Sequence, residues 1–203
     1  MTKIELQVEF LKQYDTYIKR PGAESFREWL LSTDFFSAPA STRFHGNFDG
    51  GLCWHSLNVF QELIRLLKAY PEITAPNGKQ AISGETIAII SLLHDVCKAN
   101  CYNPTTRNVK NDETGKWEKK PWYDFDEKYP IGGHGAKSVY LITKHMYLTD
   151  PEASAIMCHM GSFEFNDKYG NVSGAYSTYP IAWLLHVADE SASYIREVGV
   201  TSL

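Results

Sequence analysis

The pair His94-Asp95, followed three residues later by Lys98, brings together groups that can bind a metal or transfer a proton. The pair directly follows the most apolar run of the chain, residues 87–93, which we expect to form a buried helix. Burying an unpaired charge is unfavourable, so a charged group in such a place is usually paired or bound to a metal. The sequence therefore predicts a metal site or a proton-transfer site at His94-Asp95.

Four other segments offer the same kinds of side chain. His55 lies in the apolar stripe of an expected helix, although a histidine in such a stripe is more often a satisfied core residue than a ligand. The other candidates are His134, His159 and Asp189, each in or beside an expected helix. Imidazole and carboxylate together suit hard to borderline divalent metals, and facing helices commonly build such sites. We expect one or two divalent ions (Mn, Fe, Mg, Ni, Co or Zn) as cofactors.

The elements that would position these residues follow from apolar periodicity and from helix start and stop signals. The expected helices cover residues 3–19, 23–31, 52–70, 83–98, 134–146, 150–161 and 181–195. A loop is expected over 72–82. The fold class expected from this pattern is all-α.

Residues 99–131 differ in composition, because aromatic side chains alternate there with polar and charged ones. Asp112 to Gly115 predicts a turn between two short extended pieces, 107–111 and 116–120, so a small β-hairpin insertion is a candidate here. Such an excursion directly after the candidate site is either a substrate lid or a surface hairpin held down by its aromatic residues. Acidic residues among its basic ones favour a solvated hairpin over a phosphate-gripping lid.

Composition narrows the class of protein. The chain has 203 residues, 43% of them hydrophobic, which suits one domain with a sizeable core. The formal net charge is −4 and the basic residues are not massed, so no extended nucleic-acid-binding face is expected. No apolar run approaches the roughly 20 residues of a membrane span. No CxxC pair and no signal peptide are visible, so we expect a cytoplasmic protein with free thiols.

Several local motifs lie at the candidate ligands. Residues 50–57 (Gly-Gly-Leu-Cys-Trp-His-Ser-Leu) are similar to a Gly-Gly-Leu-x-x-His-[Thr/Ser]-Leu helix start, and residues 93–98 to Leu-His-Asp-[Ile/Val]-Gly-Lys, with Cys97 in place of glycine. Gly133-His134 and Ala188-Asp189 match a Gly-His and an Ala-Asp motif, and residues 159–161 resemble His-His-Gly with Met160 as second residue. In this order the motifs resemble the HD superfamily of metal-dependent phosphohydrolases over residues 44–196, in particular the HD domain of YhaM-type 3′-5′ exoribonucleases.

The resemblance implies a fold and a division of the chain. The whole of 1–203 would form one HD domain, a helical bundle in which residues 1–48 are an N-terminal helical cap. Residues 49–198 would be the core, interrupted by the insertion 99–131.

The resemblance also implies roles for individual residues. A first metal would be held by His55, His94, Asp95 and Asp189, and Asp95 would bridge to a second metal held by His134 and His159. Two ions about 3.5–4 Å apart can clamp a phosphate and lower the pKa of a bridging water toward about 7.

Two further residues have competing interpretations. Lys98 would neutralise a phosphate oxygen as a catalytic residue, or else form a salt bridge or be solvated. His45 remains from a histidine pair that this family carries before the double glycine. It would contact substrate or act as an acid, or else anchor its loop.

The implied function is hydrolysis of a phosphomonoester or phosphodiester by a metal-activated water, with a nucleotide-like small molecule as substrate. A nucleic-acid 3′ end is a second substrate class, although the chain lacks the RNA-binding domain of YhaM-type enzymes. A di-iron oxygenase with the same ligand order and a nucleotide-binding regulatory module are the alternatives. No membrane partner is expected, and the motifs set no oligomeric state.

The cysteines beside the ligands and His186 have plainer interpretations. Neighbouring residues on a helix point in different directions, so we expect Cys53, Cys97 and Cys158 to fill the core. His186 is expected to pack between helices, with a supporting contact to the site as the alternative.

Overall fold

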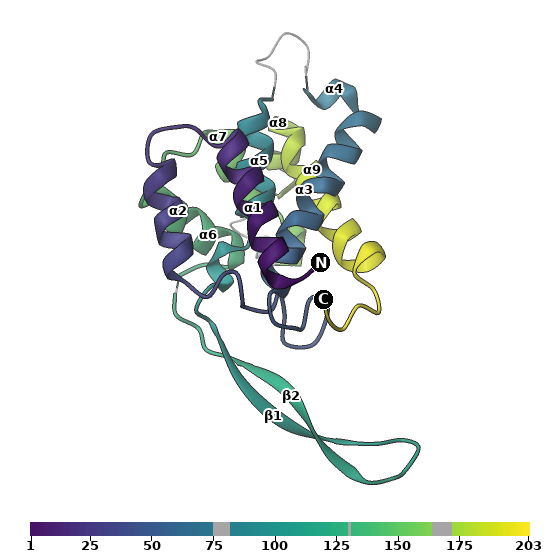
Figure 1. Cartoon of the computed structure of the whole chain (residues 1–203). Helices are drawn as coiled ribbons and strands as arrows, with labels where there is room; N and C mark the ends of the chain where they lie inside the picture. The colour runs from purple at the N-terminus through teal and green to yellow at the C-terminus, as the bar shows by residue number, and fades with distance from the viewer. Residues whose placement is uncertain (75–81, 130, 164–171) are drawn as a thin grey trace.

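The structure, a computed structural model, describes residues 1–74, 82–129, 131–163 and 172–203. Its α-helices are α1 (Lys3–Tyr17), α2 (Ala23–Ser32), α3 (Gly51–Ala69), α4 (Pro71–Thr74), α5 (Gly84–Leu92), α6 (His134–Thr143), α7 (Asp150–Met157), α8 (Val172–Thr178) and α9 (Pro180–Ser191) (Figure 1). Short 3₁₀ turns cover Val96–Lys98 and Gly161–Phe163, and a π-helix covers Ala192–Arg196. Most of the loop expected over 72–82 lies outside the described residues, and 71–74 belong to α4.

Helix α3 lies at the centre and contacts α1, α5 and α9, while α9 also packs on α7 and α8. Apolar side chains from Leu6 to Ala192 join in one buried cluster, which includes residues of α1 and α2. The Tyr14 hydroxyl donates to the Ala23 carbonyl at 2.8 Å and ties α1 to the start of α2. The N-terminal helices therefore share the core of the remaining helices. The division at 48/49 and the single-domain assignment stay predictions.

The expectation of an all-α fold was wrong. The chain is 56% helical and also contains a two-stranded antiparallel sheet, formed by β1 (Tyr102–Lys110) and β2 (Trp117–Phe125). β-Branched and aromatic side chains favour extended backbone here, and Pro104 and Pro121 are incompatible with a helix interior. Each strand of a two-stranded sheet is an edge strand, and edge strands tolerate proline. The strands can therefore continue through Pro104 and Pro121, and the hairpin is longer than the two short pieces expected from the turn.

Most of the hairpin extends away from the helices, and only its base packs on the core (Figure 1). Tyr102 at the base is buried, and Tyr123 and Tyr129 pack partly against the core. Farther out, the Arg107 guanidinium lies 3.7 Å from the ring centre of Trp122, and Trp117 is exposed. This arrangement agrees with the surface-hairpin interpretation of residues 99–131.

Helices α5 and α7 both end earlier than expected. Helix α5 ends at Leu92, where a helix to Lys98 was expected, and α7 ends at Met157, where a helix to Gly161 was expected. Both expectations were wrong for a similar reason, because an imidazole takes the place of a backbone donor at each helix end. His94 and His159 therefore lie in turns that follow these helices, not on them.

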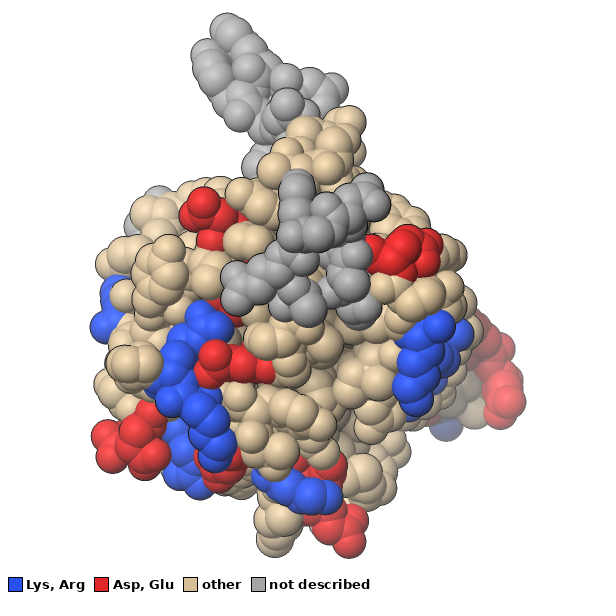
Figure 2. All heavy atoms as spheres, turned by 90° about the horizontal axis from the view of Figure 1, so that it is seen from above, with Lys and Arg blue, Asp and Glu red and all other residues tan. Residues whose placement is uncertain are grey.

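The charges on the face opposite the hairpin are mixed. Figure 2 shows lysine and arginine side chains beside aspartate and glutamate side chains, with no broad area of one sign on the described part of this face. Among the described residues, no helix has the length and apolar character needed to cross a membrane.

Arg20 joins the N-terminal segment to the starts of α5 and α7. Its guanidinium donates two 2.7 Å hydrogen bonds to the two carboxylate oxygens of Glu152 and a 3.2 Å bond to Glu85. The Glu152 side chain is fully buried. Burial raises the pKa of Glu152, but hydrogen bonds from Arg20, the Thr149 amide and Thr86 outweigh it, so the pKa lies below the usual value.

We predict that Arg20→Met destabilises the protein by roughly 3–5 kcal/mol at neutral pH, because Glu152 then stays buried without its cation. The lowered pKa of Glu152 implies stability that is present above its unfolded value of 4.5 and lost as the pH falls through the folded value. The difference between wild type and variant should therefore narrow in acid. Urea denaturation over a pH series measures both effects.

Lys3→Ala is the matched control, because it breaks the exposed Lys3–Asp49 pair. It should cost no more than about 1 kcal/mol. Equal losses in the two variants would contradict a special role for the Arg20 contacts.

Candidate metal centre

The loop before α3 places His45 against His55, which lies in the second turn of this helix. Gly50 has φ +85°, and a Cβ at Gly51 would lie 1.9 Å from the Gly46 carbonyl oxygen, so both positions need glycine. This close approach packs the loop before α3 onto the helix. The rings of His45 and His55 consequently lie 4.6 Å apart between centroids.

His94 and His159 are oriented by the helix ends that they follow. His94 Nδ1 donates to the Ser91 carbonyl at 2.8 Å, and His159 Nδ1 donates to the Ile156 carbonyl at 2.7 Å. A carbonyl oxygen only accepts, so Nδ1 must carry the proton in both rings. In the neutral imidazoles the Nε2 atom then presents a lone pair, and both side chains are fully buried.

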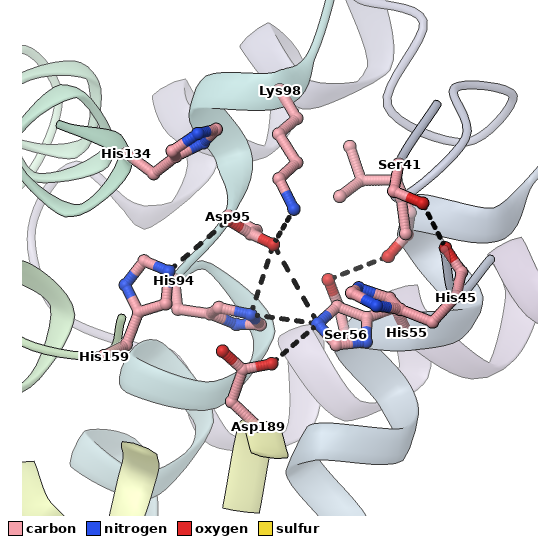
Figure 3. A network of polar contacts seen from close by, with 12 residues as sticks. Ser41, His45, His55, Ser56, His94, Asp95, Lys98, His134, His159 and Asp189 are labelled. Atoms are coloured by element: carbon pink, nitrogen blue, oxygen red, sulfur yellow. Dashed lines mark hydrogen bonds and ion pairs between the residues drawn. The ribbon is translucent and has the colours of Figure 1, made fainter. Parts of the chain in front are cut away.

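His55 is also oriented through its Nδ1 atom, in this case by the carboxylate of Glu197. Its Nδ1 lies 3.1 Å from each carboxylate oxygen of Glu197. Its Nε2 lies 3.1 Å from Asp189 Oδ1 and 3.3 Å from His94 Nε2. Figure 3 shows His55, the consecutive residues His94 and Asp95, His159 and Asp189 pointing toward one another.

The result is a buried group in which imidazole Nε2 atoms and carboxylate oxygens must share protons or a metal ion. Burial lowers the pKa of His159, but Asp95 outweighs it and raises this pKa above the usual value. His159 Nε2 lies 3.5 Å from Asp95 Oδ1, and neither atom has a hydrogen-bond partner within the described part of the chain. Lone pairs and carboxylate oxygens repel one another unless a cation lies between them. Imidazole nitrogen and carboxylate oxygen are ordinary ligands of divalent metals, so these residues fit such an ion.

Protons and metal ions compete for such a group. Burial lowers the pKa of His55, but Glu197 and Asp189 outweigh it and raise the pKa to about 10. Burial dominates at His94 and lowers its pKa to about 4. His94 is therefore neutral and available as a ligand, whereas a metal must displace a proton to bind His55.

The potential ligands form overlapping sets whose ligand atoms lie within 4.8 Å of one another. These sets are His55/His94/Asp189, His94/Asp95/His159, Asp95/Cys97/His134 and His45/His55/Glu197. Asp95 belongs to two of them, and its Oδ2 also lies 3.5 Å from His94 Nε2 and 3.9 Å from His55 Nε2. The structure thus brings together every metal-ligand candidate derived from the sequence, with His134 at the side of Asp95 (Figure 3).

Lys98 and His45 lie at the edge of this group. The Lys98 ammonium is 2.6 Å from Asp95 Oδ2, which is the salt bridge that was one of the two interpretations of Lys98. Burial lowers the pKa of Lys98, but Asp95 raises it above the usual value, so the side chain stays charged. Burial, with the charges of His55 and Lys98, lowers the pKa of His45 to about 4, so a neutral imidazole faces the site.

Sequence reasoning missed Glu197. This side chain is 1% exposed, accepts a 2.8 Å hydrogen bond from Asn58 and holds His55. It directly follows the π-helix 192–196, so α-helical periodicity does not place it on the core side. The available signal was Asn58, a buried polar residue three positions after His55 on the same face of α3.

His186 contacts the site through the backbone. Its Nδ1 donates to the His159 carbonyl at 2.7 Å, which supports the turn that carries His159. This matches the supporting role that was the alternative interpretation of His186.

Comparison of the chain with protein-family models, with curated proteins and with solved structures found no match. The site geometry and the order of the motifs are therefore the basis for a functional proposal.

We predict that Asp189→Asn weakens binding of Mn²⁺ or Zn²⁺ by more than the roughly 10- to 100-fold typical of losing a residue that supports a ligand. The reason is the loss of a charged oxygen 3.1 Å from His55 Nε2. Isothermal titration calorimetry on chelator-treated protein measures the affinity. Glu190→Gln is the control, because this acid is the next residue of α9 and is exposed. Unchanged affinity in Asp189→Asn would contradict a metal at this position.

We predict a smaller effect for Glu197→Gln, a loss of roughly 10- to 100-fold in metal affinity. The neutral amide still fits, but it no longer supplies the negative charge that orients His55 and increases its basicity. Glu197→Asp should recover part of the affinity. A loss of fold in Glu197→Gln, seen by circular dichroism, would instead indicate a structural role.

Proposed function

We propose that the protein is a divalent-metal-dependent phosphohydrolase that cleaves a phosphate ester of a nucleotide-like small molecule. The observation that carries this proposal is the convergence of three imidazole Nε2 atoms on two buried carboxylates with a lysine ammonium beside them. The motif order that resembles the HD superfamily supports it independently.

Asp95 would be the residue that serves two ions. Its Oδ1 faces His159, whereas its Oδ2 faces His94, His55 and Lys98. When bound, one or two divalent ions would supply a water of lowered pKa and polarise the phosphoryl group. The two oxygens of Asp95 thus point to different ligand sets, which suits a bridging carboxylate.

Lys98 and His45 would contact the substrate. Lys98 is charged, its side chain is 11% exposed, and its ammonium lies 2.6 Å from Asp95 Oδ2 at the edge of the candidate ligands. It could neutralise a phosphate oxygen while it also bonds Asp95. His45 is half-buried beside His55, and its Nε2 has no hydrogen-bond partner among the described residues. This neutral imidazole could hydrogen-bond the leaving group.

The burial of the site favours a small substrate or a chain end. Asp95 and Asp189 are 3% and 6% exposed, so the middle of a polymer could not approach them closely. His45 and His134 are the half-buried members, and we propose that substrate enters on their side. A nucleoside phosphate fits this constraint, and so does a nucleic-acid 3′ end.

We predict hydrolysis by the metal-loaded protein in a panel of nucleoside monophosphates, cyclic nucleotides and short oligonucleotides. Asp95→Asn should reduce activity to background, because it removes the bridging charge. Lys98→Met should lower kcat by about 10²–10³-fold, the effect typical of removing one group that stabilises transition-state charge. Phosphate release measures the hydrolysis of monophosphates by all three proteins, and chromatography of the products measures the hydrolysis of cyclic nucleotides and oligonucleotides. Lys68→Met, at an exposed position on α3, is the control.

The alternatives give different results in the same assays. A metal-loaded wild type as inactive as Asp95→Asn on every ester would refute the proposal. Oxygen uptake that depends on substrate and bound iron would then identify an oxygenase. Nucleotide binding without turnover would identify a regulatory module.

A further inference from the structure

Cys97 provides a sulfur atom at the side of the candidate centre. Its Sγ lies 3.8 Å from His134 Nδ1, and Asp95, Cys97 and His134 offer ligand atoms within 4.8 Å of one another. The similar motif has glycine at this position, which carries no side chain. This chain therefore places a potential ligand where the motif supplies none.

The backbone holds Cys97 in place from two sides. The 3₁₀ turn Val96–Lys98 follows Asp95 directly and packs against α6, the helix that begins with His134. The Cys97 amide donates to Ser138 Oγ at 3.3 Å, which fixes the turn on that helix. The thiol is 3% exposed, so the side chain has little freedom to turn away.

A second observation points to a cation beside this thiol. Asp95 Oδ1 is buried without a hydrogen-bond partner among the described residues, as is His159 Nε2 opposite it. A positive ion next to Asp95 would satisfy both atoms. Carboxylate oxygen, imidazole nitrogen and thiolate sulfur together favour a borderline ion such as Zn²⁺ over Mn²⁺ or Mg²⁺.

We propose that Cys97 is a thiolate ligand of the metal held by Asp95 and His134, and that it biases this half of the centre toward zinc. The inference rests on the metal centre of the proposed function but not on its substrate. On binding, a metal–sulfur bond forms, the S–H bond breaks and the proton leaves to solvent, with no change of oxidation state. The centre then has one half with nitrogen and oxygen ligands and one half with sulfur.

The other cysteines offer matched controls. Cys101 is buried four residues away and donates to the Cys97 carbonyl at 3.2 Å, and Cys53 donates to the Leu6 carbonyl at 3.7 Å. Neither belongs to any of the ligand sets within the described part of the chain.

Cobalt substitution tests the proposal without any phosphate substrate. Full-length protein loaded with Co²⁺ should show a sulfur-to-metal charge-transfer band in the near ultraviolet. The band should disappear in Cys97→Ser and Cys97→Gly and persist in Cys101→Ser. Zinc affinity, measured against a chromophoric chelator, should fall at least about tenfold in the Cys97 variants, with a smaller loss for Mn²⁺.

The outcomes separate this inference from the proposed function. A fully cobalt-loaded wild type without the band, or a band unchanged in Cys97→Ser, overturns the role of Cys97 even if the protein hydrolyses phosphate esters. A thiolate band in an inactive protein supports Cys97 and refutes the hydrolase. Failure to bind cobalt or zinc overturns both. Circular dichroism of Cys97→Gly confirms that a lost band is not a lost fold.

Discussion

The orientation of three imidazole rings governs this structure. His94, His159 and His55 each use Nδ1 to donate to a fixed acceptor, which is a helix-end carbonyl in two cases and Glu197 in the third. Each Nε2 is thereby turned toward Asp95 or Asp189 in a region from which water is largely excluded. The buried carboxylates are unfavourable unless protons on the imidazoles or a metal ion neutralise them, and the raised pKa values of His55 and His159 reflect this need.

The need to orient His94 and His159 also accounts for how the short helices α5 and α7 are held in place. Helix α5 begins beside Glu85 and leads to His94, and α7 carries Glu152 in its first turn and leads to His159. Arg20 ties both starts together, and Asp95 lies between the histidines that follow both ends. Each helix is thus fixed at both ends by charge and along its length by apolar contacts. This gives the candidate ligands a rigid base, which a metal site would require.

Residue type and apolar context were enough to find most of the site. His94-Asp95 follows an apolar helix whose residues 88–92 are buried, and Asp189 lies between Leu185 and Ala192 on the apolar side of α9, so both were conspicuous in the sequence. Glu197 was not, because a π-helix precedes it and shifts the α-helical period. Cys97 lies in the buried core cluster, as expected, but in a turn that follows the end of α5 at Leu92, so the rule that neighbours on a helix diverge does not separate it from Asp95. The expected all-α fold class was wrong because of the hairpin, in which Pro104 and Pro121 are compatible only with edge strands.

Charge balance connects the proposed metal centre to its substrate. Asp95, Asp189 and Glu197 carry three negative charges at the site, and Lys98 carries one positive charge. One divalent ion would neutralise the remainder, so a second divalent ion would leave an excess of positive charge. The Cys97 thiolate would remove part of this excess, and the phosphate of a bound ester would remove the rest. In the proposed function, a two-metal centre in this chain would therefore need one further anion for charge balance, which a metal-bound hydroxide or a phosphate ester would supply.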